Sequence, residues 1–212
     1  MRSNRSYAVQ TELKEIRPGL YRWTAAHPEW SPGAAAGSPA DWPQEVGCVL
    51  VEGPEATVLI DPLLPADRDS FLDMLDERVQ GRGLPVSVLT TIGFHRRDRD
   101  QLVRRYEAST SRAKRNLPAG VESLPVRHAG ETMFWLAEHR TLVSGDRIIG
   151  APGGGLQLCP ESWLGYLPHR MTAAGLRRAL RPLLELPVER VLVSHGEPVL
   201  SDGRSAIAAA LG

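Results

Sequence analysis

This 212-residue sequence has little cysteine, no long apolar run and no excess of charge of either sign. Two cysteines, Cys48 and Cys159, are too few for a framework of disulfides, and Cys48 lies in the apolar run VGCVLV, where a small buried residue is expected. No stretch approaches the ~18 apolar residues that cross a membrane, and residues 1–20 lack the apolar core of a signal peptide. We therefore expect a soluble, cytoplasmic protein without a membrane partner.

The balance of charge also bears on partners. Lys plus Arg and Asp plus Glu number 25 each, so no overall field attracts nucleic acid, and a small-molecule substrate or ligand is the partner that we expect. Hydrophobic residues make up 42% of the chain, enough for a substantial core. The length predicts one domain over residues 1–212. Nothing in the sequence indicates an oligomeric state.

Apolar periodicity predicts an alternation of strands and helices. Strands are expected at 19–25, 46–52, 57–60 and 86–91, two or three more within 122–149, and one before Ser194; helices are expected at 66–83, 98–106, 171–186 and 201–212. Pro182 should bend the last turns of the third helix. Each half of the chain builds strands and then a helix, which predicts an α/β protein with two mixed sheets packed face to face and helices outside.

A long segment rich in Pro, Gly and Ala separates the first two strands, at residues 27–45. Connections longer than about 12–15 residues in compact domains are usually binding loops or disordered segments. Trp30 and Trp42 give this one apolar anchors. We expect it to cover a cleft and to bring His27 over that cleft.

Polar side chains of the kind that bind metals follow several predicted strands. They occur in VLIDP, which contains Asp61, in TTIGFHRRD at 90–98, in LVSGDRI at 142–148 and in VLVSHGEP at 191–198. Strand ends are where sites assemble in α/β folds. Each strand end alone is a weak signal, but their order behind VLIDP indicates a site at these strand ends.

The order of these motifs resembles that of the metallo-β-lactamase-like hydrolase superfamily, over roughly residues 19 to 200. The best matching pieces are Gly145-Asp146 and His195-Gly196. The resemblance implies an αββα sandwich with a metal site at one edge, between the sheets. In that family an H-x-H-x-D-H motif supplies four ligands, a later Gly-His a fifth, the Gly-Asp aspartate bridges two metals, and a final histidine completes the set.

This sequence departs from that pattern in its first motif, and two registers remain open. In one, His95 takes the second histidine position, and the other positions are held by Gly93, Arg97 and Asp98. In the other, an ungapped count from the strand assigns the four positions to Thr91, Gly93, His95 and Arg96. The later motif, HAGETMF, has Glu131 where the resemblance implies a histidine ligand.

The residues that survive in either register are His95, Asp146 and His195, with Glu131 as a possible fourth ligand. Such a set suits at most one divalent metal, most readily zinc. A guanidinium beside the site, Arg96 or Arg97, disfavours a second cation. Alternatively, a guanidinium replaces the metal and pairs with Asp146 through a bidentate hydrogen bond, so that no metal is needed.

Three functions follow from these alternatives. The first is a metal-dependent hydrolase of a small ester, thioester, lactone or phosphoester, with Asp146 or Glu131 accepting a proton from water and His195 as ligand or proton donor. The second is a non-catalytic, metal-free member of the fold that binds a ligand or a protein. The third is a metal-free acid/base enzyme that uses His95 and His195. The sequence does not choose among them.

Overall fold

A computed structural model describes residues 11–111, 116–167 and 171–212. The strands are β1 (Lys14–Arg17), β2 (Leu20–Ala26), β3 (Glu45–Glu52), β4 (Thr57–Ile60), β5 (Val86–Leu89), β6 (Ser109–Ser111), β7 (Val121–Val126), β8 (Glu131–Leu136), β9 (Thr141–Ser144), β10 (Ile148–Gly150), β11 (Leu156–Leu158) and β12 (Arg190–Val193). The helices are α1 (Arg68–Arg82), α2 (Arg99–Tyr106), α3 (Ala173–Leu180) and α4 (Gly203–Leu211), with short 3-10 turns η1 (Gly93–Arg96), η2 (Glu161–Leu164) and η3 (Arg181–Glu185).

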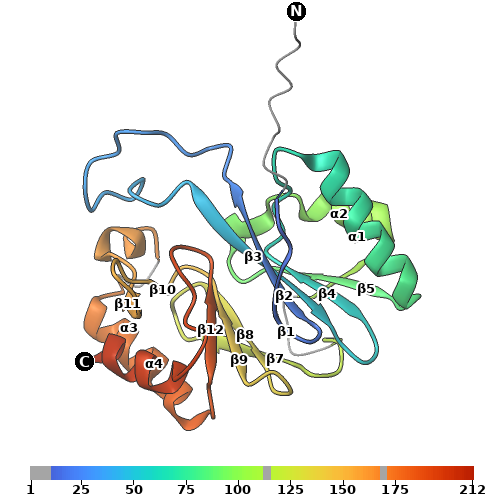
Figure 1. Cartoon of the computed structure of the whole chain (residues 1–212). Coiled ribbons are helices and arrows are strands. Elements are labelled where there is room, and N and C mark those ends of the chain that lie inside the picture. The colour runs from blue at the N-terminus through green and yellow to red at the C-terminus, as the bar shows by residue number, and fades with distance from the viewer. Residues whose placement is uncertain (1–10, 112–115, 168–170) are drawn as a thin grey trace, which may run out of the picture.

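Two mixed sheets face each other, as Figure 1 shows. The first has the strand order β1-β2-β3-β4-β5-β6, the second has the order β12-β9-β8-β7, and β10 and β11 form a separate hairpin. The first four strands of the larger sheet are antiparallel neighbours, whereas β4, β5 and β6 run parallel. This arrangement confirms the predicted α/β fold of two packed sheets with helices outside.

The alternation of side chains along β3 shows how one strand serves two layers. Val49 and Val51 face the second sheet and pack in a cluster with Phe134 on β8. Their neighbours Cys48 and Leu50 point the other way and pack in the cluster that contains residues of α1. Because successive side chains of a strand point to opposite faces, an almost continuous apolar run is required for a strand that is covered on both sides.

The helices cover the outer faces of the two sheets (Figure 1). Phe71 and Leu75 of α1 pack under the larger sheet, while Leu176 of α3 and Ile207 of α4 pack against the smaller one. The predicted helix at 171–186 ends earlier than expected, at Leu180, and a 3-10 turn follows in which Pro182 stands near the start and lacks the N–H for a continuing α-helix. No helix in the described ranges is long and apolar enough to span a membrane.

Both cysteines are buried free thiols. Burial raises the pKa of each thiol to about 11. Since the thiolate is the reactive form, neither Cys48 nor Cys159 should react with Ellman's reagent over several minutes at pH 8 in the folded protein. Both should react at once in 6 M guanidinium chloride. Rapid reaction of either thiol in the native protein would show that its layer of the core opens readily.

Candidate functional site

The carboxyl ends of two parallel strand pairs meet at one edge of the sandwich. Strands β4 and β5 pair in parallel in the larger sheet, and β9 and β12 pair in parallel in the smaller one. The first residues beyond these strands include Asp61, Asp146 and His195, and His95 lies in η1 a few residues after β5. Parallel pairing places strand ends side by side, which is why residues so distant in the sequence converge here.

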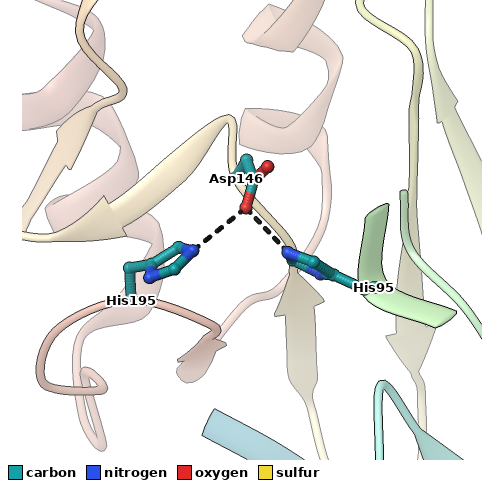
Figure 2. A group of neighbouring side chains, drawn as sticks. All are labelled: His95, Asp146 and His195. Atoms are coloured by element: carbon teal, nitrogen blue, oxygen red, sulfur yellow. Dashed lines mark ion pairs between the residues drawn. The ribbon is translucent and has the colours of Figure 1, made fainter. Parts of the chain in front are cut away.

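His95, Asp146 and His195 direct their side chains at a common point (Figure 2). Nε2 of His95 lies 3.0 Å from Oδ1 of Asp146, and Nε2 of His195 lies 3.3 Å from the same oxygen. All three atoms are within 4.8 Å of one another. The two histidines are buried, and Asp146 is partly buried.

This arrangement fits a metal ion better than a hydrogen-bonded network. Oδ1 of Asp146 is shielded from solvent, and although two imidazole nitrogens approach it, neither meets it in hydrogen-bonding geometry. Ligand atoms about 2.0–2.1 Å from a tetrahedral zinc ion are separated by about 3.4 Å, close to the observed 3.0 and 3.3 Å. Two imidazoles and one carboxylate are also a donor set that zinc accepts, with further positions left for solvent or substrate.

Asp61 holds His95 from behind. Its Oδ2 lies 2.9 Å from Nδ1 of His95, while its Oδ1 accepts a 2.8 Å hydrogen bond from the backbone N–H of Thr91, whose hydroxyl also donates to Oδ2. A carboxylate on the far nitrogen of an imidazole fixes its tautomer and leaves Nε2 as the atom that can bind metal. The sequence placed Asp61 at the site without assigning it this contact.

The charges of the site are strongly coupled. Burial alone would lower the pKa of His95, but the carboxylates of Asp146 and Asp61 outweigh it and raise the pKa to about 9. Burial likewise opposes ionisation of Asp146, yet His95 and His195 hold the pKa of that carboxyl well below its usual range. Burial lowers the pKa of His195. A metal ion at Nε2 of His95 would therefore displace a proton, as binding to imidazole ligands requires.

Glu131, which the sequence offered as a fourth ligand, is committed to the backbone instead. Its carboxylate accepts hydrogen bonds from the N–H groups of Gly145 (3.0 Å), Asp146 (2.7 Å) and Arg147 (2.9 Å). Burial, together with the nearby Asp146, raises the pKa of Glu131. The residue is buried and does not belong to the group of converging ligand atoms among the described residues. Glu131 therefore shapes the turn that presents Asp146.

Arg97 joins the two sheets and does not pair with Asp146. Its Nη1 donates to the carbonyl oxygens of Asp61 (2.7 Å) and Gly47 (3.1 Å), and its Nη2 donates to the hydroxyl of Ser194 (3.0 Å). These contacts reach the ends of strands in both sheets. The backbone of Arg97 has a φ of 40°, a region that residues other than glycine seldom adopt. The arginine clamp considered from the sequence is not formed with Asp146.

The remaining residues of the 88–100 segment lie outside the converging group. The carboxylate of Asp98 accepts from the backbone N–H of Leu64 and pairs with Arg68, each at 2.7 Å. Arg96 is exposed and lies 3.5 Å from Asp100. Of the basic residues that the sequence placed near a ligand position, only Arg97 reaches the strand ends.

A cleft of about 440 Å³ opens above the three ligand atoms. The segment at 27–45 contributes His27, Glu29, Pro39 and Trp42 to its wall, and the opposite wall is formed by Ser162, Trp163, Gly165 and Tyr166. His27 lies over this cleft, edge-on to Trp42 at 5.1 Å between ring centroids. Phe94 and Arg97 complete the lining beside His95, Asp146, Val46 and His195.

Several residues of the site gave no usable signal in the sequence. Trp163 packs edge-on against His195 at 5.3 Å, and Phe94 packs edge-on against Tyr166 at 5.1 Å. Arg147 is fully buried and donates to the carbonyl of Ala129 and to the hydroxyl of Tyr166. The one available signal was the position of Arg147 directly after Gly-Asp. The contacts of the other residues join elements that are far apart in the sequence, so sequence spacing could not indicate them.

The comparisons with known proteins agree with this geometry at the level of the fold. No family model and no curated protein matches the sequence. Among solved structures, the metallo-β-lactamase of Erythrobacter litoralis has a TM-score of 0.62 at 15% identity, with 96% of this chain and 91% of that chain covered. The metallo-β-lactamase FIM-1 from Pseudomonas aeruginosa, in its mono-zinc form, has a TM-score of 0.60 at 11% identity, with coverages of 95% and 94%.

A third structure, VMB-1, gives a TM-score of 0.57 at 13% identity, covering 95% of this chain and 98% of that chain. At these identities the similarity concerns the fold. The chain thus has the metallo-β-lactamase fold, and the fold that the resemblance in the sequence implied is confirmed.

Proposed function

We propose that this protein is a hydrolase that binds at most one divalent metal ion, zinc being the leading candidate, through His95, Asp146 and His195. Its substrate would be a small ester, thioester, lactone or phosphoester. The observation that carries the proposal is the convergence of three ligand atoms beneath a cleft, with Oδ1 of Asp146 buried and without a hydrogen bond. A bound ion would supply Lewis acidity, which lowers the pKa of water toward ~7 and polarises a carbonyl or phosphoryl oxygen.

The protein's own residues account for the remaining requirements. Asp61 orients His95, and Glu131 fixes the turn that carries Asp146. Because the Glu131 carboxylate is occupied by backbone N–H groups, Oδ2 of Asp146 is the carboxylate oxygen left beside the site to accept a proton from water. Trp42 and Trp163 line the cleft and exclude bulk water around the reacting groups.

The donor atoms that converge among the described residues suit one metal ion and not two. The position that Glu131 would take as a further ligand is filled by its contacts with the turn, and a Cβ built on Gly145 would lie 2.5 Å from the hydroxyl of Thr91 and 3.2 Å from Oε2 of Glu131. Thr91 and Glu131 thus close tightly around Gly145. This packing leaves the two histidines and Asp146 as the donor set.

Metal content is the direct test. Protein purified without a histidine tag and loaded with zinc, manganese or iron in turn should retain about one equivalent of metal after gel filtration. His95→Ala should reduce the retained metal to background, because it removes one of three protein ligands. His128→Asn, a change outside the converging group, should keep the full equivalent. If no metal is retained after any loading, the hydrolase proposal fails.

A metal-free binding module is the second candidate, and one observation favours it. His95 lies between the carboxylates of Asp61 and Asp146, 2.9 Å and 3.0 Å from them, so the charge of a protonated His95 would offset their negative charge without a metal ion. This candidate predicts that the folded protein takes up no metal. The same loading experiment therefore decides between the two.

A further inference from the structure

The wall of the cleft contains several aromatic and apolar side chains, and some of them are exposed to solvent. In the part of the chain that the structure describes, three large hydrophobic residues are well exposed: Phe94 (65%), Tyr166 (51%) and Leu200 (42%). Two of the three, Phe94 and Tyr166, stand together at the mouth of this cleft, with ring centroids 5.1 Å apart. Exposed apolar groups concentrated at one cleft indicate a ligand with an apolar surface.

The two aromatic rings come from segments far apart in the sequence and meet beside the ligand group. Phe94 lies in η1, next to His95, and Tyr166 follows η2 in the wall that contains Trp163. Tyr166 is anchored from below by the buried Arg147, which immediately follows Asp146. A flat group packed against this contacting pair of rings would therefore be held close to Asp146.

The charges at the cleft are poorly suited to an anionic substrate. Among the described residues of its lining, Arg97 is the sole arginine or lysine. Both N–H groups of its Nη1 and one of its Nη2 are used by Gly47, Asp61 and Ser194, and its Nε is shielded from solvent. At most one N–H of the guanidinium remains, so the bidentate contact that phosphate prefers is not available. The carboxylate of Glu29, also in the lining, would repel a phosphate.

We propose that the cleft takes a neutral carboxylic ester, thioester or lactone that carries an aromatic or similarly flat apolar group, which packs against Phe94, Tyr166 and Trp163 in the lining. This inference rests on the proposed hydrolase function and narrows it by setting phosphoesters aside. In the reaction, the oxygen of water bonds to the carbonyl carbon and the bond from that carbon to oxygen or sulfur breaks. One proton of water goes to the leaving group, and the other is lost from the acid that forms.

The test measures ligand binding and hydrolysis on the same preparations. The neutral fluorophore N-phenyl-1-naphthylamine should bind the zinc-loaded protein with enhanced emission. Phe94→Ser should raise its Kd about 5- to 10-fold, as expected for loss of an aromatic contact. Leu200→Ser removes the third exposed hydrophobic side chain, outside this cleft, and should leave the Kd unchanged. Neutral 2-naphthamide should displace the fluorophore at a concentration at least tenfold lower than 2-naphthyl phosphate.

An unchanged Kd in Phe94→Ser, or tighter binding of 2-naphthyl phosphate, would overturn the assignment. Metal content and the hydrolysis of 2-naphthyl acetate are measured on the same preparations. These two measurements distinguish failure of the ligand assignment from failure of the proposed hydrolase function. A protein that binds zinc and hydrolyses this ester but shows neither binding pattern keeps the hydrolase function and loses the proposed aromatic binding site. A protein that shows both binding patterns but takes up no metal and hydrolyses nothing keeps the apolar ligand and loses the hydrolase function.

Discussion

Replacing Asp146 with alanine is expected to abolish high-affinity metal binding, with the Kd for zinc raised at least 100-fold. Asp146 supplies the oxygen on which both imidazole nitrogens converge, at 3.0 and 3.3 Å. Removing even a partner behind a ligand typically costs 10- to 100-fold in metal affinity, so loss of the ligand itself should cost more. Competition with a chromophoric chelator gives the Kd directly. Substitution with Co²⁺ adds an absorption spectrum that reports the coordination geometry.

Asp61→Asn provides the matched comparison, because it keeps the side-chain volume and removes the charge behind His95, while one amide oxygen remains to accept from Thr91. Asn tolerates the positive φ of 50° at this position. We expect a 10- to 100-fold rise in Kd, between the wild type and Asp146→Ala. In the wild type, free zinc at 100 times the Kd should stabilise the fold by about 2.7 kcal/mol, and Asp146→Ala should show no such gain. Equal zinc affinity in all three proteins would show that Asp146 is not a metal ligand.

Replacing Glu131 with alanine is expected to destabilise the protein by about 3–5 kcal/mol, a large share of the 5–15 kcal/mol typical of a whole domain. The substitution leaves the N–H groups of Gly145, Asp146 and Arg147 without the acceptor that they share. Two of these groups belong to fully buried residues, Gly145 and Arg147. Urea unfolding, followed by tryptophan fluorescence and circular dichroism, measures the change in the free energy of unfolding.

Glu131→Gln keeps the result interpretable if Glu131→Ala does not fold. The amide has one acceptor oxygen and turns an NH2 donor toward another donor, so an intermediate loss of about 1–3 kcal/mol is expected. Glu122→Ala, an exposed change on β7, serves as the control and should alter stability by less than about 0.5 kcal/mol. If Glu131→Ala proves as mild as this control, the turn holding Asp146 does not depend on the buried carboxylate.

Local patterns in the sequence were sufficient for most of the secondary structure. The strand at 57–60 coincides with β4, and the helix expected at 66–83 is found at Arg68–Arg82, ending at Gly83 with a φ of 61°. Alternating or continuous apolar residues and a glycine cap are short-range signals, so they can be identified without knowledge of the partner elements. The edge strands β1, KEIR, and β6, STS, were not predicted, because a single apolar residue in the first and none in the second give no apolar period.

The sequence also indicated that His95, Asp146 and His195 belong to one site, through their positions beyond apolar strands and the superfamily resemblance. It did not determine which acidic and basic neighbours share that site as ligands. Glu131 and Arg97 have the right chemistry for the roles considered, but their hydrogen-bonding partners lie 13 to 97 residues away in the chain. Sequence spacing carries no information about such contacts.

What the sequence by itself determined is most of the strands and helices, the fold class and the three residues near the strand ends, because each depends on local periodicity or on a short motif. Only the tertiary structure decided that Asp61 supports His95, that Glu131 serves the backbone and that Arg97 joins the sheets. Those outcomes depend on how the two sheets pack and on which hydrogen-bond donors the packing shields from solvent. That packing buries each carboxylate and guanidinium beside the partners that then fix its role.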